Sequence, residues 1–214
     1  SRWNWLLNSI TGEKKIPSFG WGVKLMRSWV NQNGLNRKGL NFDSYTLGER
    51  ICNSLLFSRL IKGKWNSLPS DLNQFILNDT LQLINNLEYH EYDLIGNHLF
   101  NNGRAIYFFS KVFEVKTLEK LSKLIILERL KVLITEDGFL REGSSHYHLL
   151  FTRWLFEIYF VTDEYKDDLF KKKLKVILNK MISKSDFFLI RKDNKYKMPL
   201  IGDVSPDFDP DWLI

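Results

Sequence analysis

Apolar side chains recur every three or four residues along most of the chain, the spacing that gathers them on one face of an α-helix. Start and stop signals frame several of these runs, such as Asp43-Ser44 before one run and Gly63 after it. The loops between the runs are a few residues long, which favours antiparallel neighbours. We therefore predict a mainly α protein of antiparallel helix pairs, with helices over residues 21–31, 41–62, 70–87, 92–113, 117–134, 145–161 and 166–183.

The pattern changes near the C-terminal end. Two short β-prone runs, 187–190 and 196–201, flank the turn residues 192–195 and predict a β-hairpin. We therefore expect one helical domain over residues 1–185 and the start of a β-rich domain over residues 186–214. The chain opens without a methionine and stops inside what reads as a continuing segment, so we expect a fragment that lacks both ends.

Composition adds limits on function. With 44% hydrophobic and 14% aromatic residues, the chain has ample apolar surface for a core, and its seven tryptophans fit either a sugar-binding cleft or plain packing. The net charge of +6 favours an anionic partner, and much of it lies in residues 166–197, where a solvated helix face is favoured over a binding patch. Cys52 alone excludes a disulfide within the chain, and no apolar run is long enough for a membrane span.

Chemistry-bearing residues gather in two places. Asn97-His98 lies on a predicted helix, and the turn 137–148 contains His146, Tyr147 and His148, so that three of the four histidines lie in these two segments. This concentration predicts a site. Arg50 lies among apolar neighbours and must be paired if it is buried, as a structural ion-pair partner or as a wall of the site; we favour the structural role.

The order and spacing of several short motifs resemble those of the heparinase II/III family of polysaccharide lyases, in particular of members found among bacterial surface-polysaccharide genes. The fold that the resemblance implies is an incomplete α/α toroid followed by a β-sandwich, of which this chain would hold most of the toroid and the first hairpin. The motifs are Gly96-Asn97-His98-Leu99, Asp137-Gly138, Glu142, Tyr147-His148 and Leu200-Ile201-Gly202-Asp203, with support from Tyr45-Thr46-Leu47, Arg50, Asn53 and residues 88–94.

The resemblance implies β-elimination on a uronate-containing anionic polysaccharide. Removal of the C5 proton adds a second negative charge beside the carboxylate, and the amide of Asn97 suits neutralisation of that carboxylate. His98 suits charge stabilisation or base catalysis. Tyr147 is the expected proton carrier; because a phenol has an unperturbed pKa of about 10, it needs nearby positive charge to act as a base.

The remaining expected site residues are substrate-binding ones: Arg104, Arg141, Glu142, His146 and His148. Glu142 could instead position a histidine or form a buried pair with Arg50. The His-x-His pair is a weak zinc signal, so we expect no metal in this chain; the family's metal ligands would come from the sandwich domain. No cofactor is expected.

Two other functions stay open. A non-catalytic module would bind surface polysaccharide without cutting it, and an α/α-barrel glycoside hydrolase would need two facing carboxylates, for which Glu142 with Asp203 or Glu49 are the candidates. Nucleic-acid binding is not expected, because the lysines form no recognised motif with aromatic residues. The resemblance implies a periplasmic or secreted protein, and we expect the isolated 214-residue chain to be weak or inactive as a lyase. The sequence does not indicate the oligomeric state.

Overall fold

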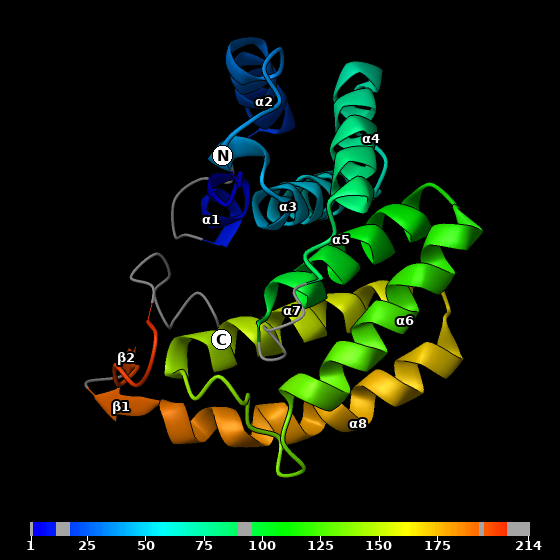
Figure 1. The fold of residues 1–214 in the computed structure, drawn as a ribbon. Coiled ribbons are helices and arrows are strands. Elements are labelled where there is room, and N and C mark those ends of the chain that lie inside the picture. Colours follow the sequence, from blue (N-terminus) through cyan, green and yellow to red (C-terminus); the bar gives the residue numbers. More distant parts are fainter. Residues whose placement is uncertain (1, 12–17, 90–95, 193–194, 205–214) are drawn as a thin grey trace. The chain divides into compact units, whose positions relative to one another are not determined.

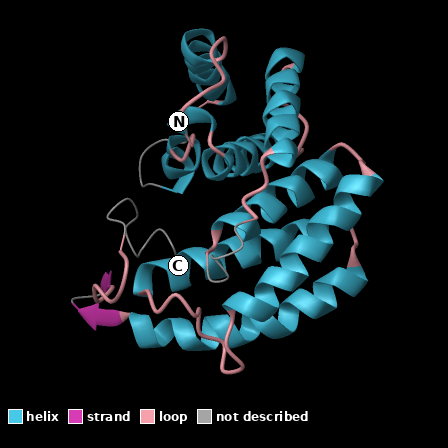
Figure 2. Ribbon diagram, viewed as in Figure 1, coloured by secondary structure: helices cyan, strands magenta, loops and turns pink. Residues whose placement is uncertain are grey.

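The computed structural model describes residues 2–11, 18–89, 96–192 and 195–204, and these residues are mainly helical, as predicted (Figures 1 and 2). Two short 3-10 turns, η1 (Leu40–Phe42) and η2 (Asp186–Phe188), interrupt the helices, and the strands β1 (Ile190–Lys192) and β2 (Lys195–Lys197) form an antiparallel hairpin. The α-helices are α1 (Trp5–Thr11), α2 (Phe19–Asn33), α3 (Ser44–Lys62), α4 (Ser70–Asn85), α5 (His98–Val112), α6 (Lys116–Leu133), α7 (Ser145–Glu164) and α8 (Asp168–Ser185).

The chain divides into two compact units. Unit 1 contains residues 1–88 and 101–122, and unit 2 contains residues 89–100 and 123–214, so that α5 and α6 each contribute to both. The described residues after 185 belong to unit 2, and the expected start of a separate domain at residue 186 stays a prediction.

Unit 1 is built around α3, on which α1, α2 and α4 pack (Figure 1). The predicted start and stop residues cap α3. The Asp43 carboxylate accepts the Thr46 N–H at 2.7 Å, and Gly63 ends the helix at φ +69°. Helix α2 approaches closely at Gly22, where an added Cβ would lie 2.3 Å from Cζ of Phe57. Almost the whole length of α3 is buried, which is why its apolar and polar residues show little amphipathic pattern.

Arg50 of α3 has the structural role that the sequence favoured. Its Nε donates to Asp79 Oδ2 at 2.7 Å, and Arg37 contacts the other oxygen of the same carboxylate at 2.6 Å. The guanidinium lies over the rings of Trp29 and Phe42, at 4.7 and 5.0 Å from their centroids. Both the Arg50 and the Asp79 side chains are fully buried, so this ion pair belongs to the core of unit 1.

In unit 2, α7 and α8 form an antiparallel pair (Figure 1). The buried stripe of α8 that packs in this unit is Phe170, Leu174, Leu178 and Met181. The spacing of four, four and three residues is that of one helix face.

The predicted elements need correction at one helix and two strands. Helix α1 was missed, because its aromatic and polar residues show no clear helical period. The first strand was predicted from Phe187 but begins at Ile190, because Phe187 and Phe188 form η2, where the Phe188 ring is buried against Phe139 and His148. The second strand ends at Lys197 rather than at residue 201. The predicted start of the helix over 92–113 lies in residues 90–95, outside the described part, and the described helix α5 begins at His98.

Candidate active site

Unit 2 contains seven of the eight predicted site residues. They come from three stretches of sequence that the fold brings into one compact unit: the start of α5, the turn before α7, and the first turn of α7. They are Asn97, His98, Arg141, Glu142, His146, Tyr147 and His148, and Arg104 is the exception.

A hydrogen bond joins the first two stretches. Asn97 Nδ2 donates to Glu142 Oε2 at 3.2 Å, across 45 residues of sequence. Asn97 is buried, with 6% of its surface exposed, and its Oδ1 has no hydrogen-bond partner among the described residues. Glu142 is half-buried. An amide held in this way keeps a fixed orientation next to a carboxylate, which is what a preorganised polar site requires.

The first turn of α7 positions Tyr147. Ser144 is the N-cap residue of α7, and its Oγ accepts the Tyr147 N–H at 3.1 Å. The buried ring of His146 meets the Tyr147 ring edge-on, with centroids 5.3 Å apart and planes at 84°. Because the N-terminal end of a helix carries a partial positive charge, this turn favours negative charge on groups beside it.

The Leu200–Asp203 motif lies against the same helix end. Ser145 donates its Oγ–H to Pro199 O at 2.6 Å and its N–H to Ile201 O at 3.0 Å. Ser144 Oγ also donates to the carbonyl of Asp203. The two serines thus clamp the segment after the hairpin onto the start of α7.

Gly202 makes this clamp possible. It has φ +69°, and an added Cβ would lie 2.6 Å from the carbonyl oxygen of Gly143. Ser144 and Ser145 are functional residues that were not predicted, although a Gly-Ser pair ahead of an apolar-periodic run is a helix N-cap signal that points to the first of them.

His148 is held by the backbone on both sides. Leu140 donates its N–H to Nδ1 at 3.3 Å, and Nε2 lies 3.1 Å from the carbonyl oxygen of Met181 in α8, so the hydrogen belongs on Nε2. Burial lowers the pKa of His148 below its ordinary value, against the raising effect of the Met181 hydrogen bond. The ring is fully buried and ties α7 to α8, and its predicted role in substrate binding stays a prediction.

Arg104 is the one residue of the eight that is not in unit 2. It belongs to unit 1, where its Nη1 donates to Glu49 Oε1 and to Asn101 Oδ1, both at 2.7 Å. Its side chain is 1% exposed. A guanidinium neutralised by a buried carboxylate connects α3 to α5, and the predicted sugar contact of Arg104 stays a prediction.

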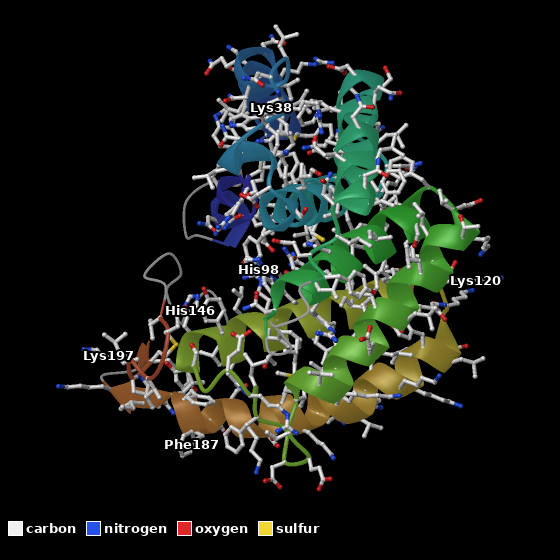
Figure 3. The ribbon with its side chains drawn as sticks, in the orientation of Figure 1. Lys38, His98, Lys120, His146, Phe187 and Lys197 are labelled. Atoms are coloured by element: carbon white, nitrogen blue, oxygen red, sulfur yellow. The ribbon has the colours of Figure 1, made fainter. Side chains whose placement is uncertain are left out.

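His98 and Arg141 are exposed, and Figure 3 marks His98 at the start of α5 and His146 at the start of α7. The backbone N–H of Arg141 donates to Leu133 O at 2.8 Å, which fixes the turn that presents its side chain. The catalytic and substrate-binding roles of the exposed and half-buried residues of the cluster stay predictions. We call Asn97, His98, Glu142, His146 and Tyr147 the Asn97–Tyr147 cluster.

Within the described part of the chain, no three histidine, cysteine or acidic residues lie close enough together to hold a metal ion. None of the described helices combines the length and the apolar character that a membrane span requires.

Comparison with known proteins supports the fold. No protein-family model and no curated protein sequence matches the chain. A crystal structure of heparinase III matches with a TM-score of 0.59 and 19% identity over 88% of this chain, and a second heparinase III structure, the BT4657 gene product, matches with a TM-score of 0.54 and 17% identity over 78% of it. This chain spans about 30% of the length of each. The predicted fold class, helices of an incomplete α/α toroid followed by a β-hairpin, is therefore confirmed: the chain has a heparinase III-like fold.

Proposed function

We propose that this chain is the helical part of a polysaccharide lyase that cleaves a uronate-containing anionic polysaccharide by β-elimination. The observation that carries the proposal is the hydrogen bond between Asn97 and Glu142, which joins the two motifs expected to act together. The heparinase III-like fold supports the same class of enzyme.

In this proposal, Asn97 neutralises the substrate carboxylate. Loss of the C5 proton moves negative charge onto that carboxylate, and an amide N–H already oriented by Glu142 stabilises the charge without reorganisation. Glu142 is then a positioning residue. In this proposal the Asn97 amide lies between the Glu142 carboxylate and the substrate carboxylate.

Tyr147 transfers the proton. It lies in the first turn of α7, where the helix dipole stabilises a phenolate, and the adjacent His146 ring restricts its orientation. The proton removed from C5 passes to the phenolate, the C4–O4 bond breaks as the C4–C5 double bond forms, and the phenol returns the proton to the departing O4. His98, exposed beside Asn97, contacts the carboxylate or assists the base.

The hydrolase alternative has less support. Among its candidate carboxylates, Glu49 is buried and paired with Arg104 in unit 1, which leaves it unsuited to acid or base work. The binding-module alternative is distinguished by experiment, because binding without cleavage produces no new chain ends. A substrate of this kind lies outside the cytoplasm, so we propose a periplasmic or secreted protein.

The test is direct. The complete gene product that contains this chain is incubated with a panel of polyuronates and glycosaminoglycans, and ultraviolet absorbance of the conjugated 4,5-unsaturated uronate is followed. A rise in absorbance with at least one polymer is the expected result. Detectable binding with no rise on any polymer supports the binding module, and new reducing ends without absorbance support hydrolysis.

A further inference from the structure

The positive charge of this protein is concentrated in one short segment. Ten of the 31 lysines and arginines and two of the 25 acidic residues lie in residues 171–197, which gives this segment a net charge of +8 and leaves −2 for the rest of the chain. Between residues 171 and 185 there is no aspartate or glutamate. Because the charge imbalance is confined to one segment, it produces a local positive potential at the protein surface, in addition to any general contribution to solubility.

The structure places Lys172, Lys173 and Lys175 on the exposed surface of α8, whereas the half-buried Lys171 is paired with Asp163. The buried stripe from Phe170 to Met181 fixes which face is covered, and on a helix with 3.6 residues per turn Lys172, Val176 and Asn179 lie opposite to it. Lys172, Lys173 and Lys175 are exposed, and none of the three forms an ion pair with a described residue. Their charges therefore face solvent without compensation.

The face continues to the end of the helix. Lys180 Nζ donates to Glu136 O at 2.9 Å, and the Lys184 ammonium lies 5.5 Å from the centroid of Phe139. A carbonyl and an aromatic ring carry no full negative charge, so neither of these contacts is an ion pair. Beyond η2, the hairpin adds the exposed Lys192 and Lys197, and Figure 3 marks Lys197 on the hairpin at the end of α8.

The geometry also gives the face a direction. Because α7 and α8 are antiparallel, the C-terminal half of α8 lies beside the start of α7, as the contact of His148 with Met181 O shows. The basic face therefore runs along α8 towards the helix end that carries Tyr147.

We propose that the outer face of α8 and the hairpin after it form a second binding surface for anionic polysaccharide, which attracts the polymer and leads it towards the Asn97–Tyr147 cluster. The choice of a polysaccharide as the anion rests on the proposed function. The lysines from 172 to 184 extend over about 18 Å of helix, which suits an elongated polyanion better than a small anion. A membrane surface fits less well, because the continuous apolar stripe of α8 is buried within unit 2 rather than turned outward.

The test compares two triple variants with the same change in net charge. Lys172→Glu, Lys173→Glu and Lys175→Glu reverse the charge of the α8 face, whereas Lys24→Glu, Lys38→Glu and Lys120→Glu reverse three exposed lysines elsewhere. Circular dichroism and thermal unfolding establish that both remain folded. Binding of fluorescein-labelled polygalacturonate is measured by anisotropy over a range of salt concentrations, with neutral dextran, duplex DNA and anionic vesicles as comparison probes.

We expect the α8 variant to bind polygalacturonate at least about tenfold more weakly and with a shallower salt dependence, because fewer counterions are released on binding. The control variant should stay within about twofold of wild type. Equal weakening of both variants, no weakening of the α8 variant, or wild-type binding to DNA or vesicles that is tighter than to polygalacturonate at the same salt would overturn the inference.

The outcome is independent of catalysis. Binding that depends on the α8 lysines without any unsaturated product would sustain this surface and remove the proposed lyase function. Unsaturated product from the complete gene product, with wild-type polymer binding by the α8 variant, would sustain the lyase function and remove the α8 binding surface.

Discussion

Asn97 Nδ2 donates a hydrogen bond of 3.2 Å to Glu142 Oε2, and this bond links two motifs that are 45 residues apart in the sequence. Asn97→Asp replaces the donor with a second carboxylate beside Glu142. We expect a loss of about 1–3 kcal/mol in the free energy of unfolding, because a buried hydrogen bond is exchanged for repulsion. Denaturant unfolding of the single variant measures it.

The double variant Asn97→Asp with Glu142→Gln is the matched control. It exchanges donor and acceptor between the two positions, so the hydrogen bond can form again in the reverse direction. A double-mutant cycle should show that most of the lost stability returns. If the losses in unfolding free energy of the single variants Asn97→Asp and Glu142→Gln simply add in the double variant, the contact contributes nothing to stability. The inference that this bond couples the two motifs is then wrong.

Gly202 should tolerate no side chain. Gly202→Ala places a Cβ 2.6 Å from a backbone oxygen at a positive φ, whereas Gly63→Ala meets no atom within 4 Å at the same φ of +69°. We expect about 1–2 kcal/mol of destabilisation for Gly63→Ala from the left-handed conformation alone, and a clearly larger loss for Gly202→Ala. Thermal unfolding compares the two. Equal losses would mean that the segment after the hairpin yields easily and that the serine clamp does not hold it.

Two aspartates of unit 1 that pair with arginines offer a second comparison. Asp79 is fully buried between Arg50 and Arg37, whereas the Arg27–Asp71 pair is about half exposed. Asp79→Asn leaves a buried guanidinium without its counter-charge, and we expect a loss of about 3–5 kcal/mol. Asp71→Asn should cost no more than about 1 kcal/mol. Urea titrations of both variants check this, and similar small losses would show that the Arg50 site is hydrated rather than dry.

His148 should make stability depend on pH. Since burial lowers its pKa in the folded state, the unfolded chain binds more protons once the pH falls below about 6.5. The contribution of His148 to the free energy of unfolding is therefore fully present above that pH. It is lost as the pH decreases, by up to about 1.4 kcal/mol per pH unit until the folded-state pKa of His148 is reached. Unfolding free energies from pH 8 downwards measure the slope for wild type and for His148→Gln.

The variant is expected to be less stable at neutral pH but to have a shallower slope in the acid range. An unchanged slope would assign the acid sensitivity to other groups and would contradict the neutral, backbone-bonded state of His148.

Local signals in the sequence were sufficient for most helices. Asp43 and Gly63 mark the ends of α3 because a cap depends on residues a few positions away. The prediction that a strand begins at Phe187 was wrong because a distant contact decides the structure there. Burial of Phe188 against Phe139 and His148 is a tertiary contact that overrides a β-prone composition.

The same distinction applies to the cluster. The motifs indicated which residue types gather, but not which atoms pair. The motifs did not indicate that Asn97 donates to Glu142, nor that Arg50 pairs with Asp79 rather than with Glu142. His148 and Arg104 look reactive in the sequence, and only the packing reveals that backbone groups and Glu49 occupy them.

The most direct test of the account is the rate of unsaturated-uronate formation by the complete gene product and by its Tyr147→Phe variant. Tyr159→Phe, the same substitution later in α7, is the control. We predict loss of nearly all activity, at least about 100-fold in kcat, for Tyr147→Phe with polymer binding retained, and a near wild-type rate for Tyr159→Phe. A Tyr147→Phe enzyme that forms the product at the wild-type rate would contradict the assignment of proton transfer to this cluster.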